Sequence, residues 1–201
     1  MSNDLWVRPA RAADAAAIAG LLVEGFGHEY GGLAGHRMME RIHALPGRLT
    51  GIVVLESPER EVVAMAGMRT REVRGAVGWA EDQVIFEELG IGRAIWLELR
   101  ATLSEPPTYQ PRGDEAYIYN VVVTKTWRGR GAGDRLLSHL HAEAERRRKR
   151  RVLLEVVATN MHARRLYERH GYKVERARRG LLALLRLGVP ARLLMVKALS
   201  G

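Results

Sequence analysis

Three glycines at alternate positions, flanked by arginines, form the segment of this sequence best suited to bind an anion. The segment, Arg128–Gly133 (RGRGAG), lies between a β-rich apolar run and a stretch with helical periodicity. Because the glycines lack side chains, backbone N–H groups can close on an anion, and the N-terminus of the following helix adds partial positive charge. Arg128 and Arg130 add two full charges. We therefore predict a phosphate-binding loop.

The loop alone does not identify which phosphate it holds. No GxxxxGK[ST] string occurs, so the chain is not predicted to be a P-loop nucleotide-binding protein. In a dinucleotide-binding fingerprint a third glycine would stand where this sequence has Asp134, whose carboxylate would repel a pyrophosphate. For the bare motif, a glycine-rich turn that binds no ligand remains the alternative.

The segments around the loop carry a resemblance to a known family. Val121-Val122-Val123 precede the loop, and the pattern Asn160-x-x-Ala-x-x-x-Tyr167-Glu-x-x-Gly-Tyr follows it. Together they resemble the acetyl-CoA-binding core of the GNAT superfamily of N-acetyltransferases, most strongly over residues 116–174. The opening VRPARAADAAAIAGLL and the closing LLMVKAL resemble the family's first strand and helix and its last strand. Residues 75–113 depart from the family pattern because they are longer than the usual connection.

The resemblance implies the fold class and the domain organisation. We expect an α/β (α+β) fold in a single N-acetyltransferase domain over residues 4–199. Its central sheet would be mixed, with about six to seven strands flanked by helices and a helical insertion at 75–113. Apolar periodicity predicts strands over 5–9, 52–55, 62–70, 117–123, 152–157, 172–174 and 193–197. It predicts helices over 13–25, 37–45, 131–148 and 160–170, and the five glycines of Gly25–Gly35 predict a loop.

The resemblance also implies acetyl-CoA as the acyl donor and a set of residues that bind it. In the family the strands equivalent to 117–123 and 152–157 splay apart, and the pantetheine arm lies between them. Backbone groups of Val121, Val122 and Val123 would pair with that arm. The diphosphate would lie on Arg128, Gly129, Arg130, Gly131, Ala132, Gly133 and Asp134, with Asn160 and Tyr167 as further contacts. Asn160 would in addition cap its helix.

The reaction that the resemblance implies is direct transfer of the acetyl group to a primary amine in a ternary complex. It requires an amine without its proton, a place for developing negative charge and a proton for the leaving thiolate. Tyr167 matches the family's tyrosine and would be the acid, with packing in the core as its other interpretation. For the base, Glu115 is the first choice, Glu155 the second and Glu72, expected on the third strand, the third. An outward-facing Glu155 paired with an arginine is an equally good interpretation.

Charge is distributed unevenly along the chain. Residues 1–110 hold 11 Lys+Arg and 15 Asp+Glu, whereas residues 111–201 hold 21 and 8. The cationic half suits a phosphate-bearing cofactor, and the acidic half favours a cationic acceptor. The basic run Arg146–Arg151 supports a nucleic-acid-binding protein as one alternative, although a solvated helix end explains it more simply. A GNAT domain that binds acyl-CoA without catalysis is the other alternative.

Composition limits the remaining function classes. The absence of cysteine excludes disulfides, a thiolate nucleophile and Cys-ligated metals, and the histidines show no ligand spacing, so no metal is predicted. No long uncharged apolar run occurs, so no membrane association is predicted and a cytoplasmic protein is expected. The expected partner is a small-molecule or peptide amine. A homodimer is compatible with the sequence but not predicted by it.

Overall fold

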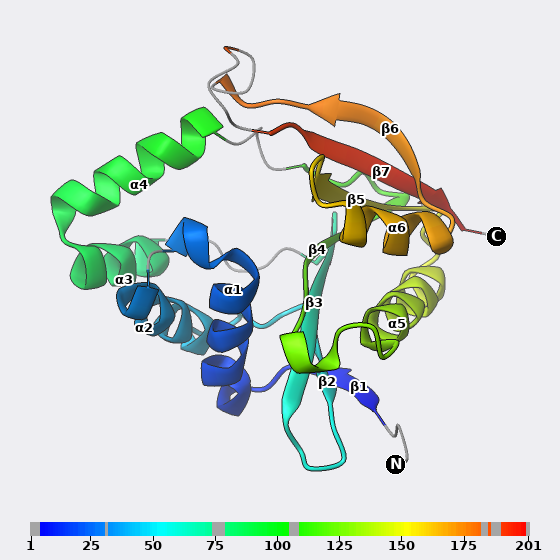
Figure 1. The fold of residues 1–201 in the computed structure, drawn as a ribbon, viewed down its shortest axis with the longest axis horizontal. Helices are drawn as coiled ribbons and strands as arrows, with labels where there is room; N and C mark the ends of the chain where they lie inside the picture. The colour runs from blue at the N-terminus through cyan, green and yellow to red at the C-terminus, as the bar shows by residue number, and fades with distance from the viewer. Residues whose placement is uncertain are drawn as a thin grey trace.

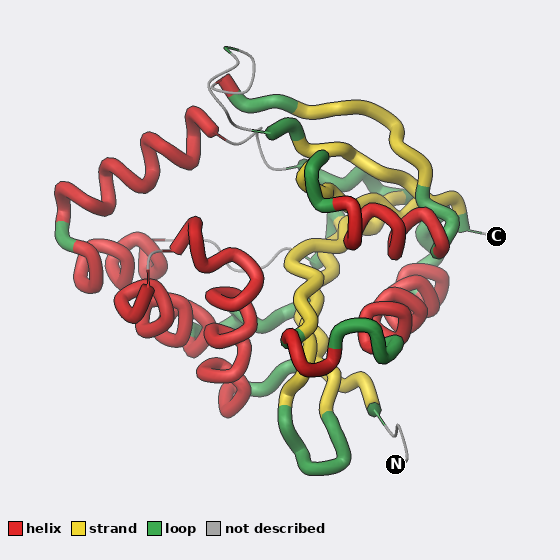
Figure 2. Tube along the Cα trace, in the orientation of Figure 1, coloured by secondary structure: helices red, strands yellow, loops and turns green. Residues whose placement is uncertain are grey.

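A twisted sheet organises the chain in the computed structural model, which describes residues 5–30, 32–73, 79–104, 109–181, 185 and 190–199. In this part of the chain seven strands form one sheet in the order β1-β2-β3-β4-β5-β7-β6 (Figures 1 and 2). All neighbours are antiparallel except β4 and β5, which are parallel. The prediction of a mixed sheet is thereby confirmed. The strands are β1 Trp6–Pro9, β2 Ile52–Glu56, β3 Val62–Thr70, β4 Glu115–Val123, β5 Arg151–Val157, β6 Lys173–Arg178 and β7 Arg192–Ala198.

Helices cover both faces of this sheet (Figure 1). On one face α5 and α6 pack on the strands, and on the other face α1, α2 and α3 do so. The predicted insertion at 75–113 contains α3 and α4, so its helical character is confirmed; residues 74–78 and 105–108 lie outside the described part. The helices are α1 Ala15–Tyr30, α2 Gly32–Ala44, α3 Trp79–Leu89, α4 Ile91–Ser104, α5 Ala132–Arg146 and α6 Met161–Arg169, with short 3-10 turns η1 Ala12–Asp14 and η2 Lys125–Trp127.

The helix α5 shows why these residues form this layer. Leu136, Leu137, Leu140 and Ala144 recur at helical spacing and are all buried against β-strand residues such as Leu154. A single apolar stripe of this kind removes most of its side-chain area from water, and burying each leucine is worth about 2 kcal/mol relative to leaving it exposed. Polar residues occupy the opposite side, including Glu143, which binds Arg147 one helical turn further along.

The predicted loop over Gly25–Gly35 is wrong. The helix α1 continues to Tyr30 and α2 begins at Gly32, so most of this glycine-rich segment is helical. The chain bends at Phe26, where φ is −132° and ψ is 21°. Glycine weakens a helix by about 1 kcal/mol per residue, but burial of the flanking apolar residues can offset that loss. The glycines therefore mark a kink and not the end of the helix.

One close approach fixes how β3 and β4 pair. Gly67 of β3 lies opposite Tyr119 of β4, and the tyrosine ring covers the glycine. A Cβ atom on Gly67 would stand 2.2 Å from Cζ of Tyr119, well inside van der Waals contact. Gly67 thus allows an aromatic ring to lie flat across the neighbouring strand.

We predict that Gly67→Ala destabilises the protein by about 1–3 kcal/mol, because the ring must move out of a packed site. Urea denaturation measures the change. Gly92→Ala on α4, where a Cβ meets nothing within 4 Å, is the matched control and should change stability by at most about 1 kcal/mol, in the stabilising direction. An equal response of the two variants would contradict this account, as would an unchanged cost of Gly67→Ala in a Tyr119→Ala background.

Candidate active site

The parallel ladder between β4 and β5 ends early. It runs from Glu115 opposite Arg151 to Ile118 opposite Leu154, and no further pair joins the two strands in the described part of the chain. Beyond this point β4 pairs with β3 alone and β5 pairs with β7. Backbone N–H and C=O groups of Val121–Val123 on the β5 side therefore lack a strand partner, and buried backbone groups of this kind need one. An extended ligand with amide groups can supply it.

A β-bulge lies at the same place. The register between β3 and β4 shifts between Met65 and Gly67, and Asn120 has a φ of 50° in the left-handed region that asparagine tolerates. After the bulge Val122 faces the core formed with α1 and α2, where a Cβ on Gly25 would stand 3.0 Å from its Cγ1. The bulge was not predicted, although an asparagine within the apolar run YIYNVVV is the signal that could have indicated it.

The glycine loop has the backbone conformation that an anion site requires. Gly129 and Gly131 have φ values of 74° and 79°, and a Cβ at either would meet nothing within 4 Å. Gly131 is the N-cap of α5 and no side chain caps this helix. The N–H groups of the first turn, which begins at Ala132, are thus left for an anion, together with the helix dipole.

The third glycine of the loop has a different role. A Cβ on Gly133 would stand 2.9 Å from Cδ2 of Leu166, so this glycine lets α5 and α6 approach each other closely. Next to it, the Asp134 carboxylate accepts from His170 Nε2 at 2.9 Å and from Arg169 at 3.3 Å. The repulsion that the sequence predicted is offset, because this charge is bound to the end of α6.

A second carboxylate, missed by the sequence analysis, holds the other side of the loop. Glu24 of α1 accepts from Thr124 Oγ1 at 3.1 Å and from the Lys125 N–H at 2.6 Å, and it pairs with Arg128 at 3.4 Å. Arg128 also donates to the Val123 carbonyl at 2.9 Å. Glu24 stands a hundred residues away in sequence, so no local motif could reveal this contact.

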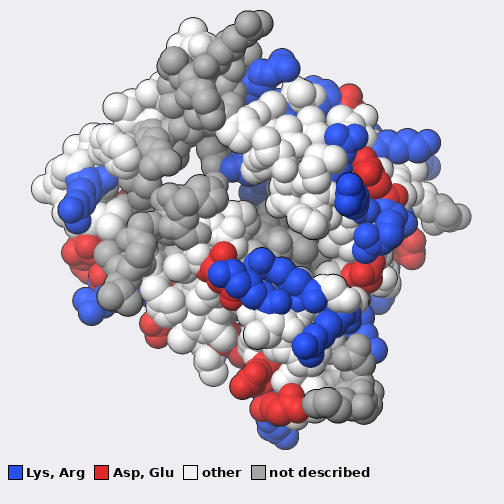
Figure 3. All heavy atoms as spheres, viewed as in Figure 1, with Lys and Arg blue, Asp and Glu red and all other residues white. Residues whose placement is uncertain are grey.

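Positive charge surrounds the loop. The Arg130 guanidinium lies 5.6 Å from the centre of the Trp127 ring and is exposed. Figure 3 shows Lys and Arg side chains (blue) gathered over the region where η2, the loop and α6 lie in Figure 1. This arrangement favours a ligand that carries phosphate groups.

Tyr167 and Asn160 are both on α6. Tyr167 is buried against the α5 side of the sheet, burial raises the pKa of its phenol to about 12, and no hydrogen bond engages its hydroxyl within the described residues. Its ring lies 6.0 Å from that of Tyr172. Asn160 is the N-cap as predicted, because its Oδ1 accepts from the Ala163 N–H at 3.1 Å, which leaves its NH₂ group available.

The three candidate bases have different surroundings. Glu115 is 1% exposed at the start of β4, and its oxygens accept from the Tyr109 hydroxyl at 2.7 Å and the Arg112 N–H at 3.0 Å, and pair with Arg151 at 3.2 Å. Val121 is six positions further along the chain, about 20 Å in an extended strand. Its carboxylate is thus fully engaged and remote from the open edge.

Glu155 is the first β5 residue beyond the ladder. It lies on the face of Leu153 and Tyr117, opposite to α5 and α6, and forms an ion pair with Arg178. Burial and the Glu155 charge together raise the pKa of Tyr117. Glu155 is therefore the candidate base nearest to the open edge of β4.

Glu72 is not on the third strand as expected, because β3 ends at Thr70. The Lys149 ammonium, 2.8 Å from Glu72 Oε2, and the hydroxyl of Thr70 lower the pKa of this carboxyl to about 2. Such a carboxylate is a weak proton acceptor.

The basic run at the end of α5 is largely paired within the protein. Arg146 and Arg147 bind Glu143, and Arg151 binds Glu115 and Glu175. Lys149 is 8% exposed and bound to Glu72 and to the Gly113 carbonyl. The run offers fewer unpaired charges than its sequence suggests.

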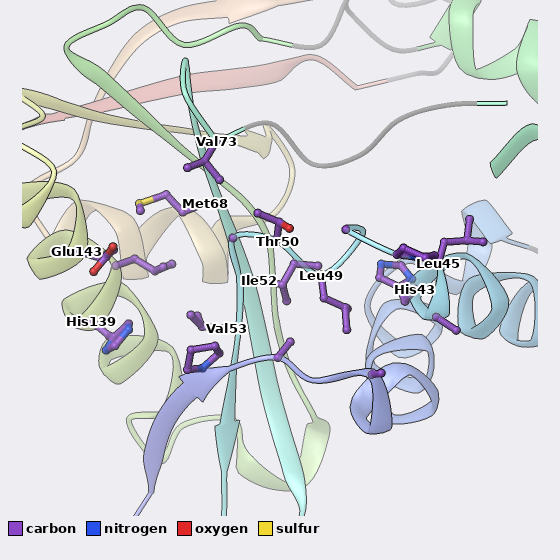
Figure 4. A pocket seen from close by; sticks show the side chains of 18 of the residues that line it. His43, Leu45, Leu49, Thr50, Ile52, Val53, Met68, Val73, His139 and Glu143 are labelled. Carbon is purple, nitrogen blue, oxygen red and sulfur yellow. The ribbon is translucent and has the colours of Figure 1, made fainter. Parts of the chain in front are cut away.

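A cavity of about 590 Å³ lies elsewhere, where the short edge strand β1 stops (Figure 4). His139 and Glu143 of α5 line it from one side, and His43 and Leu45 of α2 and its following turn from the other. It contains none of the predicted site residues. Among the described residues no three His, Asp or Glu side chains gather as metal ligands, and no helix there is long and apolar enough to cross a bilayer.

Comparisons with known proteins agree with the site. The model of a protein family described as "Acetyltransferase (GNAT) family" matches residues 21–172 of this chain. A solved structure described as an acetyltransferase is 21% identical, covers 97% of this chain and 100% of its own, and has a TM-score of 0.69. An N-acetyltransferase from Staphylococcus aureus Mu50 is 18% identical, with coverages of 96% and 100% and a TM-score of 0.63.

A Salmonella typhimurium protein solved with its cofactor acetyl-CoA is 17% identical, covers 98% and 95%, and has a TM-score of 0.57. At these identities the structures show a shared fold. No curated protein matches the sequence significantly. Because the family match spans most of the chain and coincides with the open β4 edge and the glycine loop, this protein belongs to the GNAT acetyltransferase family.

Proposed function

We propose that this protein is an N-acetyltransferase that moves the acetyl group of acetyl-CoA to a primary amine by direct attack in a ternary complex. The observation that carries the proposal is the open backbone edge of Val121–Val123, which leads directly into the uncapped N-terminus of α5. Family membership supports acyl transfer and supports acetyl-CoA as the donor. The catalytic domain would extend over residues 4–199, and the cytoplasmic location stays a prediction.

The residues present suit the donor. The backbone of Val121–Val123 would bind the pantetheine amides, and the N–H groups from Gly129 to Asp134 would bind the diphosphate. Arg130 is exposed beside the loop and can approach the same phosphates. Acetyl-CoA supplies an activated carbonyl with a thiolate leaving group, and every other requirement must be met by the protein.

The acceptor nitrogen has to lose a proton. An alkylamine with a pKa near 10.4 is only about one part in a thousand neutral at pH 7.4. We assign the removal of this proton to Glu155, directly or through a water, because it is the first β5 residue beyond the ladder with β4 and its carboxylate is held by Arg178. Glu115 stays the alternative, although its oxygens already accept three hydrogen bonds within the protein.

The departing sulfur has to be stabilised and protonated. We assign this role to Tyr167, whose hydroxyl makes no hydrogen bond among the described residues. A raised pKa keeps the proton on the phenol throughout the physiological range, so the group is a donor at all times. In the balanced reaction a C–N bond forms and a C–S bond breaks, the amine proton passes to Glu155 and the thiolate receives a proton from Tyr167.

We predict that Gly131→Asp abolishes binding of acetyl-CoA, because it places a side chain and a negative charge at the anion site. Isothermal titration calorimetry with acetyl-CoA measures the loss. Gly90→Asp is a matched control, since Gly90 has a φ of 74° against 79° for Gly131 and a Cβ at either meets nothing within 4 Å. Both variants bear the same backbone strain, so equal heats from the two would contradict the assignment of the loop.

Tyr167→Phe should lower kcat by about 100-fold, within the usual range for loss of a general acid, and leave the Kd of acetyl-CoA unchanged. Because the pKa of Tyr167 is raised to about 12, and an acid acts below its pKa, the wild-type kcat should show no alkaline decline up to about pH 10. Tyr172→Phe removes a hydroxyl bound to His141 at 2.9 Å and should leave kcat near wild type. Parallel loss of affinity and rate in Tyr167→Phe would argue for a packing role.

The two carboxylates can be separated by their effects on rate and on stability. Glu155→Gln should lower kcat by about 100-fold, with partial recovery as rising pH supplies neutral amine. Glu115→Gln should cost about 1–3 kcal/mol of stability, because an amide cannot accept all three hydrogen bonds that the buried carboxylate receives from Tyr109, Arg112 and Arg151, while the folded fraction keeps its rate. Steady-state kinetics over pH 6–10 and urea denaturation of both variants decide the matter. The reverse pattern would identify Glu115 as the base.

A further inference from the structure

An arginine lies between two tyrosine rings on the face of the sheet opposite to α5 and α6. The Arg69 guanidinium carbon is 4.6 Å from the centre of the Tyr117 ring and 5.4 Å from that of Tyr119. Arg69 stands opposite Tyr117 in the β3–β4 register, and Gly67 gives the Tyr119 ring its room. The two rings and the strand thus hold the guanidinium in a fixed orientation.

Arg69 has no anionic partner among the described residues, in contrast to Arg8, Arg151 and Arg178. Arg8 binds Asp14 at 2.7 Å, Arg151 binds Glu115 at 3.2 Å, and Arg178 binds Glu155. Within the described residues no carboxylate lies within 4.0 Å of Arg69, and its buried Nε has no hydrogen-bond partner. A buried donor left without a partner destabilises the protein unless a ligand satisfies it.

The surroundings of Arg69 favour an anionic ligand. Burial raises the pKa of Tyr117, the Glu155 charge adds to the rise, and the positive charges of Arg69, Arg178 and Arg192 oppose it. These four charged groups therefore act on the hydroxyl of Tyr117, and among them Arg178 pairs with Glu155. Arg69 itself has no carboxylate within 4.0 Å among the described residues, so its charge is left for a ligand, and Figure 3 shows the surface hollowed between α1 and α4 on one side and β5 and β7 on the other.

Arg69 and the proposed base lie on the same face of the sheet. Tyr117, Leu153 and Leu194 form one apolar cluster there, and Glu155 follows Leu153 by two residues on β5 and so lies on the same face. The strands β3 and β5 are separated by β4 alone, which sets them about 10 Å apart. A small molecule can thus reach Arg69 with one end and Glu155 with the other.

We propose that Arg69 binds a carboxylate of the acceptor, so that the acceptor is an amino acid or a compact amine bearing a carboxylate near its nitrogen. The inference rests on the proposed function and names the substrate class of that site. The two terminal Nη groups of a guanidinium form a fork that matches the two oxygens of a carboxylate. The tyrosine rings would contact the apolar part of the same molecule.

This assignment replaces the cationic acceptor that the acidic first half suggested. Many acids of that half are bound internally: Asp14 and Glu56 to Arg8, Glu24 to Arg128, Glu72 to Lys149, Glu81 to Arg48, and Glu87 and Glu88 to Arg41. Their charge is neutralised locally and does not define the acceptor surface. Arg69 belongs to the same half of the chain and has no such partner.

Competition between matched amines tests the inference. Leucine with isoamylamine, phenylalanine with phenethylamine and tyrosine with tyramine differ only in the carboxylate. Each pair is supplied at equal concentration with acetyl-CoA, and mass spectrometry measures the ratio of the two acetylated products. Because this ratio does not depend on the fraction of folded enzyme, a variant that folds poorly still gives a valid result.

The wild type should favour the carboxylated member of at least one pair by ten-fold or more. Arg69→Gln should lower that ratio at least ten-fold and Arg69→Lys should lower it less, since lysine keeps the charge but loses the fork. The exposed Arg150→Gln is the control and should leave the ratio unchanged. The affinity for acetyl-CoA, measured by calorimetry, should be the same in all four proteins.

Equal products from the wild type in every pair, or a ratio that survives Arg69→Gln, would overturn the inference and leave the proposed function standing. If neither member of any pair reacts and a wider panel of amines gives no product, the proposed function fails and this inference fails with it. The two failures are therefore distinguishable.

Discussion

The β4–β5 ladder holds only the four pairs from Glu115–Arg151 to Ile118–Leu154, and the site depends on its early ending. A parallel pair that continued would satisfy every backbone group of β4 and leave nothing for a ligand. Beyond the ladder each strand keeps its other neighbour, β3 for β4 and β7 for β5, so the sheet stays paired on both sides of the gap. Where the two strands diverge, the β-bulge at Asn120 also changes the direction of the β4 backbone. The open edge is thus built into the sheet before any ligand arrives.

Two helices from opposite faces hold the glycine loop where this edge leads. Glu24 of α1 binds the stretch before the loop, and Asp134 is bound to the end of α6 through His170. Both contacts join segments that are distant in sequence. A loop fixed in this way loses little conformational entropy when it binds an anion, which is the general advantage of a preorganised site. Although glycine is conformationally permissive, the glycines of this loop are held in place by these contacts.

The strands and helices that are determined by residues close together in the sequence were predictable. Apolar runs rich in β-branched residues predicted β4 and β5, and the leucine stripe predicted α5. The Gly25–Gly35 prediction failed because glycine occurs both in loops and at helix kinks, and the local sequence does not distinguish the two; the structure shows a kink at Phe26. Glu115 shows the limit for site residues. A glutamate before a strand looks the same in sequence whether it removes protons or binds an arginine.

Arg69 is a second residue whose role the sequence alone does not reveal. Its interest lies in the absence of a partner, and a sequence with 32 basic and 23 acidic residues cannot say which of them pair. Net charge over half a chain averages over ion pairs that cancel locally, whereas recognition depends on the few groups left over. The acceptor class therefore follows from individual contacts. These contacts favour a negatively charged group on the acceptor, whereas the net charge of the first half favoured a positively charged one.

The placement of the proposed groups on two faces constrains the chemistry. Tyr167 lies in the core with α5 and α6, while Glu155 and Arg69 lie on the other face of the sheet. The gap between the diverging strands is where groups from both faces can approach one carbonyl. An acceptor held by Arg69 would then give its proton to one face, and the thiolate would receive its proton from the other. Separate acid and base groups follow from this geometry, because one side chain on one side of the sheet cannot reach both the amine nitrogen and the departing sulfur.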